Sequence, residues 1–409
     1  MTADQGGKLR VTIVGSGLAG LTAARILREQ HDVTVYERSG AARATGGQGL
    51  STTPNAIRIL DSVGFDRARA GSVKSRGYRT YDKAGRLVQE IDPRHEETFG
   101  VPALTHLRAD VRNELLRLAT APSDELGIRG HPARVVFETP VTGLDAEKGV
   151  VTLEDGSTVE ADVVIVADGI HSRLRELVLR SAEHKPKKAG LTCFRSSLLA
   201  EQARAALGQL PNWWTEHYHM FAAGKDGTDR FILLYPTRNL ESMNMSCIFQ
   251  TREENKDTTE SWDANGDVEE MLGVYHDFDK NVTKLFRVVN EIKMWELQDL
   301  DPLPTWCRGR AILIGDAAHA MTPMQGQGAN MSIEDGEAFR LLVQPGVSAD
   351  RVPAILRRID ELRRPRVDQV VKNTRESSFG LSAEERFTRL FQNADYNGIV
   401  DYATKRAAP

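Results

Sequence analysis

Three glycines near the amino terminus have the spacing of a turn that binds phosphates. Gly15, Gly17 and Gly20 follow a short apolar run and precede apolar residues at helical spacing, and a second apolar run ends at Glu37. In this pattern the glycines permit a tight turn and a close approach of pyrophosphate to the backbone. The helix N-terminus attracts the phosphate charge, and the acid accepts hydrogen bonds from a ribose diol. The stretch predicts a tightly held dinucleotide without a 2′-phosphate, which the Glu37 carboxylate would repel.

Two further aspartates follow buried apolar runs. Asp168-Gly169 breaks the run Val163–Val166 after one alanine, and Gly315-Asp316 comes after the run that begins at Ala311. Open α/β sheets bind ligands at the carboxyl ends of their strands, so each aspartate marks a predicted ligand-binding position. Further along the chain, Gly326-Gln-Gly-Ala-Asn330 opens a predicted helix.

The elements that must position these residues follow from the hydrophobic period. The segment Thr105–Leu118 is predicted to be one amphipathic helix, with Arg108 near its start. That end of a helix is unfavourable for a cation, which favours a phosphate or cofactor partner for Arg108 over a plain surface charge. The other elements predicted in the nucleotide-binding part are strands at Val11–Val14, Val33–Tyr36, Val135–Val141 and Val150–Leu153, and helices at Leu18–Leu27, Pro54–Val63 and Val352–Val370.

The chain changes character between Pro186 and about Leu300, where strand-like pieces alternate with polar loops. We interpret this part as a substrate-side sheet inserted into the nucleotide-binding domain, joined by a hairpin near residues 78–91. Residues 251–267 are long, polar and charged, which predicts a surface loop. The strands predicted here are Leu191–Ser197, Phe231–Tyr235 and Met243–Phe249.

The bulk composition narrows the class of protein. The chain has 409 residues, a net charge of −4 and three cysteines that are far apart in sequence. Nothing favours a nucleic-acid or anionic-membrane partner, and the odd cysteine count argues against a disulfide framework. No run approaches the ~20 apolar residues of a membrane span, and the first residues lack the apolar core of a signal peptide. We therefore expect a cytoplasmic protein without a metal site.

Together, the motifs resemble those of the single-component FAD-dependent aromatic monooxygenases, the group of the para-hydroxybenzoate and salicylate hydroxylases. The resemblance rests on the glycine turn with Glu37, on Val-Ala-Asp168-Gly169-x-His-Ser-x-Leu-Arg, and on Ile-Gly315-Asp316-Ala-Ala-His319 with Pro323 and Gly326-x-Gly328-x-Asn330. It implies an α/β fold with a Rossmann-like FAD-binding domain of the glutathione reductase type, an inserted antiparallel β-sheet substrate domain and a C-terminal helix. The expected boundaries are residues 1–75, 98–185 and 301–345 for the FAD domain, 76–97 and 186–300 for the sheet domain, and 346–409 for the C-terminal helical segment.

The resemblance also implies a set of cofactor contacts. The ADP half of FAD would lie along the glycine turn and Glu37, and the flavin ring would lie against Pro323 and the segment Gly326–Asn330. The N–H groups of that helix start would stabilise the negative charge of the reduced flavin. His319 holds a position that is mostly structural in the family, so we expect no chemical role for it. The full set of expected FAD contacts is Gly15, Gly17, Leu18, Ala19, Gly20, Glu37, Arg38, Gln48, Gly49, Arg108, Val141, Asp168, Asp316, Pro323, Gly326, Gly328, Ala329 and Asn330.

The implied reaction uses NADH or NADPH as a transient co-substrate that reduces the resident FAD. Oxygen then forms a flavin hydroperoxide, which hydroxylates or epoxidises an aromatic or polycyclic small molecule. The expected substrate contacts are Arg195, which binds a carboxylate or phenolate or pairs with an acid, and Tyr235, which orients a phenol or packs. The aromatic and imidazole cluster at residues 213–219 forms either a substrate wall or a sheet surface or subunit contact.

Two other functions remain open at this point. A flavin-dependent reductase of the same fold, similar to the prenyl-chain reductases, would share the Gly315-Asp316 motif and would not use O2. A non-enzymatic lipid-carrying protein would use a related fold without flavin chemistry. The sequence leaves the oligomeric state as a monomer or a homodimer.

Overall fold

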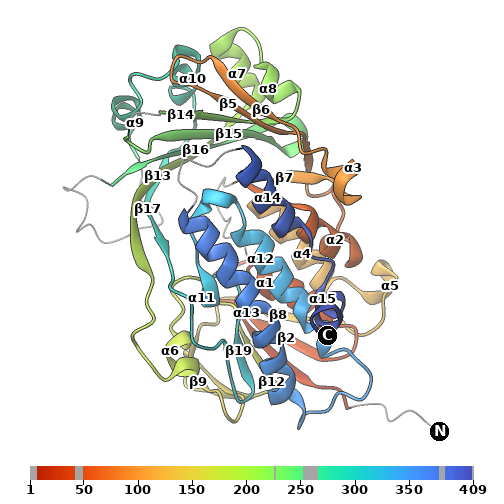
Figure 1. Ribbon diagram of the computed structural model, residues 1–409. Coiled ribbons are helices and arrows are strands. Elements are labelled where there is room, and N and C mark those ends of the chain that lie inside the picture. Colours follow the sequence, from red (N-terminus) through yellow and green to blue (C-terminus); the bar gives the residue numbers. More distant parts are fainter. Residues whose placement is uncertain (1–6, 42–48, 225–226, 252–265, 377–382, 408–409) are drawn as a thin grey trace.

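The computed structural model describes residues 7–41, 49–224, 227–251, 266–376 and 383–407. An α/β part, with the chain termini at its lower right, lies below a large twisted sheet that forms the upper part of the molecule (Figure 1). The predicted contact Gln48 and most of the predicted loop at 251–267 lie outside the described residues.

The α/β part is built on a six-stranded sheet whose central strands are buried on both faces. All its strand pairs are parallel except β18–β19, which is antiparallel. Near-continuous runs of Val and Ile form such doubly covered strands. Across the sheet the order is β18 (Cys307–Arg308), β19 (Ala311–Leu313), β12 (Val163–Val166), β1 (Arg10–Val14), β2 (Asp32–Tyr36) and β8 (Arg134–Val136).

Helices α1 (Leu18–Leu27), α4 (Arg108–Thr120) and α12 (Gly328–Glu337) form the helical layer beside the glycine turn. Every residue of α1 is buried, because α4 and α12 both pack against it. A Cβ on Gly336 would lie 2.6 Å from Thr22 Cβ, so glycine lets α12 cross α1 closely. The remaining helices of this part are α2 (Pro54–Ser62), α3 (His95–Phe99), α5 (Ser123–Leu126), α6 (Leu174–Leu179) and α11 (Asp316–His319).

Two small sheets flank this core. One joins β9 (Val141–Asp145), β10 (Val150–Leu153) and β11 (Thr158–Glu160), and the other joins β3 (Gly49–Thr52), β7 (Ala103–Leu107) and β4 (Val73–Ser75). The second sheet lies where the α/β part meets the large sheet, since β3 and β7 contact β16 and β15 respectively.

The large sheet has seven strands and two different faces. Its outer face packs on α7 (Ala200–Leu207), α8 (Asn212–Thr215), α9 (Val268–Val274) and α10 (Lys280–Phe286) to form a separate hydrophobic core. Its strand pairs are antiparallel, as predicted, except for the parallel pair β14–β5. The order is β17 (Lys293–Asp299), β13 (Lys187–Leu199), β16 (Ser242–Gln250), β15 (Phe231–Thr237), β14 (Tyr218–Ala223), β5 (Gly77–Tyr81) and β6 (Leu87–Ile91).

Two predicted elements were wrong in part. Residues 105–107 belong to strand β7, and α4 begins only at Arg108. All five β7 residues are buried and pair with β3 and β4, so tertiary pairing overrides the helical period there. The predicted strand Val135–Val141 is two strands, β8 and β9, because Glu138 has a positive φ of 53° and Pro140 lacks an N–H.

The C-terminal segment contains more than the one helix that the resemblance implies. Its described part holds α13 (Val352–Glu376), α14 (Ala383–Ala394) and α15 (Ile399–Ala407). Helix α13 packs along the α/β part and buries Arg363 completely. Within the described residues, no helix has the length and apolar character to cross a membrane. The domain boundaries stay a prediction.

Candidate active site

The glycine turn between β1 and α1 has the backbone that its sequence predicts. Gly15 has a φ of +103°, and a Cβ there would lie 2.3 Å from the Ala167 carbonyl oxygen. A Cβ on Gly20 would lie 2.2 Å from the Gly15 oxygen. Around Gly17 a Cβ would meet no atom of the described residues within 4 Å. Two glycines therefore allow close packing, and the third leaves open space in front of the first turn of α1, which starts with Leu18 and Ala19.

Glu37 lies at the end of β2 and accepts three hydrogen bonds. The N–H and hydroxyl of Ser16 donate to one carboxylate oxygen at 2.9 and 2.7 Å, and the Ser39 N–H donates to the other at 2.9 Å. Burial alone would raise the pKa of Glu37, but these hydrogen bonds from Ser16 and Ser39 lower it overall. An ionised carboxylate has about four acceptor positions, so about one is left for a ribose hydroxyl.

Two arginines lie one helical turn apart at the start of α4. Arg112 donates to the Ser16 carbonyl oxygen at 3.0 Å and to the Ser16 hydroxyl at 2.6 Å. Burial lowers the pKa of Arg112, Glu37 opposes that effect, and the charge of Arg108 adds to it. Arg108 has no hydrogen bond or ion pair with any described residue, so its charge is available to an anion. Sequence reasoning missed Arg112, although its spacing of four from Arg108 puts both on one helix face.

Asp168 and Asp316 follow the neighbouring strands β12 and β19. The buried Arg175 holds their two loops together: it donates to the Ile170 and Ala317 carbonyl oxygens at 2.7 Å each and to the Asp316 carbonyl oxygen at 3.4 Å. Oδ1 of Asp168 is buried and finds no hydrogen-bond partner in the described part of the chain. Burial raises the pKa of Asp168, against a hydrogen bond from Ser172. A buried acceptor without a partner marks a position where a bound group would donate.

The predicted flavin-side segment begins with a 3-10 turn at Pro323–Gln325 and continues into α12. Gly326 has a φ of +63° and ends that turn. The Asn330 side chain holds the helix start in place: its oxygen accepts the Thr53 N–H at 2.8 Å, and its amide donates to the Ser51 and Gly326 carbonyl oxygens. The side chain is therefore occupied by protein contacts, so only the N–H groups of this turn, including those of Gly328 and Ala329, are proposed to face a ligand.

His319 lies in a buried charge network. Its Nε2 is 2.5 Å from Oδ2 of Asp335, and the same oxygen accepts the Gly315 N–H at 2.9 Å. Arg363 of α13 pairs with Asp335 at 3.0 Å and with Glu334. His319 therefore ties the loop that carries Asp316 to α12. Its Nδ1 is buried without a hydrogen-bond partner among the described residues, and its lack of a chemical role stays a prediction.

Two of the contacts between the large sheet and the α/β part involve segments of the predicted cofactor site. Met324 of the 3-10 turn packs against the cluster around Phe231 and Ile248. The Gly49 N–H donates to Asn244 Oδ1 at 2.7 Å. Both contacting segments are ones that the resemblance places along FAD.

The strand register sets which side chains share this inner face. Arg195 lies opposite Ser246, which lies opposite Leu233, and the Arg195 guanidinium sits 5.2 Å from the centre of the Trp295 ring. In the next row Tyr235 lies opposite Asn244. Burial raises the pKa of Tyr235 against the opposing charge of Arg195, so the phenol stays neutral. The structure thus brings the two predicted substrate contacts, Arg195 and Tyr235, onto one surface.

The predicted aromatic cluster divides between the two faces of the sheet. Trp213 and Trp214 belong to α8 and are buried in the outer core, and the Trp214 ring nitrogen donates to the Leu240 carbonyl oxygen at 3.2 Å. His219 lies on the inner face, where its ring stacks on Tyr235 at 4.9 Å and meets Tyr78 edge-on at 4.8 Å. The tryptophans therefore form no substrate wall. Of the other expected contacts, Arg38 is exposed and Val141 is the first residue of β9.

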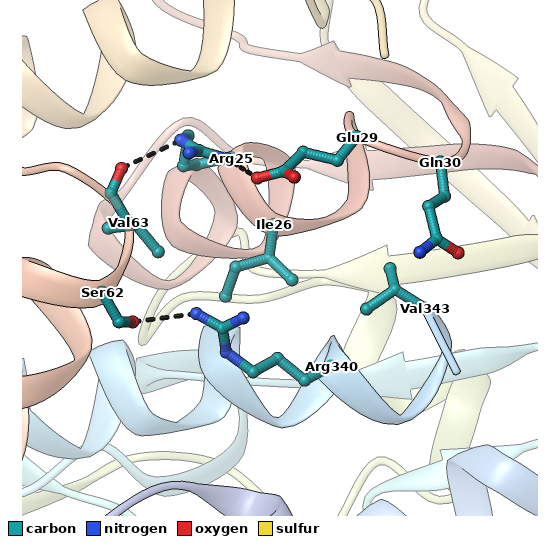
Figure 2. Close-up of a pocket in the computed structure, with 8 residues that line it drawn as sticks. All are labelled: Arg25, Ile26, Glu29, Gln30, Ser62, Val63, Arg340 and Val343. Carbon is teal, nitrogen blue, oxygen red and sulfur yellow. Dashed lines mark hydrogen bonds and ion pairs between the residues drawn. The ribbon is translucent and has the colours of Figure 1, made fainter. Parts of the chain in front are cut away.

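A separate small pocket lies beside the C-terminal half of α1 (Figure 2). Its charged lining is already paired, since Arg25 pairs with Glu29 at 2.6 Å and Arg340 donates to Ser62 at 2.8 Å. It lies at the end of α1 away from the glycine turn and contributes nothing to the nucleotide site. Among the described residues, no group of three His, Cys, Asp or Glu side chains is placed to hold a metal ion.

The residues around the glycine turn fit an FAD molecule. The open space at Gly17, the unpaired Arg108 and the buried Asp168 oxygen provide backbone donors, a cation and an acceptor, as a dinucleotide requires. The fold and the site are those of a dinucleotide-binding α/β protein with a second, larger sheet.

Comparison with known proteins then gives the family. Residues 8–374 match the family described as FAD binding domain, so the chain belongs to it. It is 32% identical over 376 residues to 3-amino-4-hydroxybenzoate 2-monooxygenase PtnB3 of Streptomyces platensis, over 90% of this chain and 87% of that protein. It is 30% identical over 387 residues to hispidin-3-hydroxylase of Neonothopanus nambi, over 91% of this chain and 89% of that protein. A salicylate hydroxylase structure with substrate superposes with a TM-score of 0.76 at 25% identity, over 98% of each chain.

These findings confirm the resemblance drawn from the motifs, the fold class and FAD as the cofactor. The chain is an enzyme of the FAD-dependent monooxygenase kind. The individual site residues stay a prediction.

Proposed function

We propose that this enzyme uses NADH or NADPH and O2 to hydroxylate an aromatic or polycyclic small molecule that carries a phenolic hydroxyl. The observation that supports the proposal is that the inner sheet face contacts both Gly49 and Met324, because this is the face that carries Arg195 and Tyr235. The names of the similar proteins fit this class, since salicylate and 3-amino-4-hydroxybenzoate are both hydroxylated aromatic acids.

In this proposal the protein binds and orients the substrate. The Arg195 guanidinium binds a carboxylate or phenolate, and the Trp295 ring beside it limits where the guanidinium can point. Tyr235, whose burial keeps it a neutral phenol, donates a hydrogen bond to the substrate oxygen. The aromatic and aliphatic side chains of the inner face exclude water. When bound, FAD accepts a hydride from NAD(P)H and activates O2.

Oxygen consumption tests the proposal directly. We expect the purified protein to be yellow, and to take up O2 only when NADH or NADPH and a phenolic substrate are both present. Salicylate, 3-amino-4-hydroxybenzoate and hispidin form the first panel, and hydrogen peroxide release is measured and subtracted to remove uncoupled oxidation. Product with one added oxygen atom supports the proposal. A yellow protein that reduces a carbon–carbon double bond without O2 uptake would establish the reductase alternative.

The proposed role of Asp316 has its own test. Its carboxylate is expected to accept hydrogen bonds from the ribityl chain of FAD, so Asp316→Ala should lose FAD on dilution about tenfold more readily than the unmodified enzyme. Asp350→Ala, which removes an exposed carboxylate that accepts a hydrogen bond from the Ser348 hydroxyl, is the control. Equal FAD retention in all three proteins would contradict the assignment.

A further inference from the structure

All three polar groups of Ser16, in the glycine turn, form hydrogen bonds with other residues of the protein. Its N–H and hydroxyl donate to Glu37, and its carbonyl oxygen and hydroxyl oxygen accept from Arg112. Ser16 is 1% exposed. It therefore has no free group for a phosphate, although it lies at the centre of the turn that the phosphate would approach.

The hydrogen bonds through Ser16 can run in only one direction. A guanidinium only donates and an ionised carboxylate only accepts, so the Ser16 hydroxyl must accept from Arg112 and donate to Glu37. This series of hydrogen bonds joins three elements, because Arg112 comes from α4, Ser16 from the turn after β1 and Glu37 from the end of β2. It links the part of the turn expected to bind pyrophosphate to the acid expected to bind the ribose.

The charges at this place distinguish Arg112 from Arg108. Arg112 is neutralised through Ser16 by Glu37, whereas Arg108 has no anionic partner among the described residues and shares the same helix start. Two cations at a helix N-terminus repel each other and the helix dipole. Arg108 is thus placed to meet the ligand, and Arg112 is placed to hold the turn.

We propose that Arg112 is a positioning residue for FAD: its two-pronged contact with Ser16 fixes the glycine turn and the Glu37 carboxylate in the geometry that binds the ADP half. The inference rests on the proposed placement of the ADP half at this turn. The planar fork of arginine makes two hydrogen bonds at once, which a lysine at this position cannot reproduce.

The test measures the release of FAD from the intact holoenzyme, followed as the rise of flavin fluorescence after dilution. Arg112→Lys keeps the charge and loses the fork, Ser16→Ala removes the hydroxyl, and the double variant removes both. On dilution, we expect each single variant to release FAD at a protein concentration about tenfold higher than the unmodified enzyme does. The double variant should release FAD no more readily than the weaker-binding single variant, because both substitutions break the same Arg112–Ser16 contact. Arg117→Lys, on the same helix but paired with Glu114, is the matched control.

Two outcomes would overturn the positioning role. Unchanged FAD release in Arg112→Lys and Ser16→Ala would exclude it, and so would additive losses in the double variant. Melting temperatures of the same proteins identify a general loss of folding, which would lower FAD retention and thermal stability in proportion. Gly17→Val fills the open space at the turn and tests the placement of the ADP half independently of Arg112. Full FAD retention in that variant would show that the ADP half lies elsewhere.

Discussion

The nucleotide end and the inner sheet face of this enzyme are built by different means. At the nucleotide end, the candidate residues follow neighbouring parallel strands, and backbone groups and a few charged side chains are expected to bind the nucleotide. On the sheet face, the side chains come from strands that are distant in sequence, and the register alone decides which of them meet. The nucleotide end therefore depends on backbone geometry, whereas the inner sheet face depends on which side chains lie opposite one another on neighbouring strands. Substitutions should therefore act differently at the two places.

The sharpest test of this contrast is Gly15→Val. The new Cβ would lie 2.3 Å from the Ala167 carbonyl oxygen in a backbone conformation with φ of +103°, so the turn must move. We expect FAD retention to fall by more than about a hundredfold, measured as flavin bound after gel filtration. Gly64→Val is the control, since Gly64 also has a positive φ but a Cβ there meets no described atom within 4 Å. Equal FAD content in both variants would show that the geometry of the turn does not matter.

The next effect concerns the charges that support the flavin side of the α/β part. Arg363→Met would remove the positive charge that pairs with the fully buried carboxylates of Glu334 and Asp335. Removing one partner of a buried ion pair costs about 3–5 kcal/mol, so the free energy of unfolding in urea should fall by that amount. Arg358→Met on the same helix breaks an exposed pair with Glu361 and should cost less than about 1 kcal/mol. Similar losses for both variants would contradict the network.

On the sheet face, His219→Phe keeps the ring stack on Tyr235 and removes a titratable group. Burial, aided by His95, lowers the pKa of His219 to about 3 from its ordinary value of 6.5. The folded state therefore binds this proton more weakly than the unfolded chain. The stability that follows is complete above pH 6.5 and is lost as the pH falls toward 3.

Between pH 7 and pH 5 the unmodified enzyme should thus lose about 2 kcal/mol of unfolding free energy that His219→Phe does not lose. Urea unfolding at both pH values measures the difference. His276→Phe changes an exposed histidine and should follow the unmodified enzyme. A parallel pH dependence in all three proteins would mean that His219 titrates normally.

The smallest expected effect lies where the two regions meet. Asn244→Ala removes the acceptor of the Gly49 N–H at 2.7 Å and should lower the unfolding free energy by about 1–2 kcal/mol. It should lower the FAD content much less than Gly15→Val does, because the hydrogen bond joins the sheet to β3 and leaves the glycine turn in place. Asn281→Ala, at an exposed position on α10, is the reference. A large loss of FAD in Asn244→Ala would show that the two regions are less separate than we describe.

The same contrast explains what the sequence could predict. The positions of the glycine turn, Asp168 and Asp316 could be predicted because each comes within a few residues of the end of its own strand, so short spacing is sufficient. The position of Arg112 needed only the helix period, once the start of α4 was known. By contrast, a shift of one residue along a strand exchanges the two faces of a sheet. The local pattern around residue 219 therefore could not show that His219 would lie beside Tyr235 on the inner face. Trp213 and Trp214 lie in α8, and only its packing on the outer face separates them from His219.

Tertiary pairing also limited the prediction of β7 and of β8 with β9. The apolar positions of residues 103–107 fit a helix as well as a strand, and only pairing with β3 and β4 selects the strand. The break at Glu138 and Pro140 has a signal in the sequence, since proline rarely continues a paired strand.

The ion pairs between α12 and α13 have a consequence for the order in which this protein folds during synthesis. Glu334 and Asp335 lie in the helix expected to face the flavin, and the arginines that neutralise them, Arg363 and Arg366, are synthesised later. A ribosome that has released α12 but not α13 therefore holds a chain whose two carboxylates have no cationic partner in that helix. The carboxylates of α12 therefore gain these cationic partners only once α13 has been made, and we expect FAD to be retained only by chains that include α13.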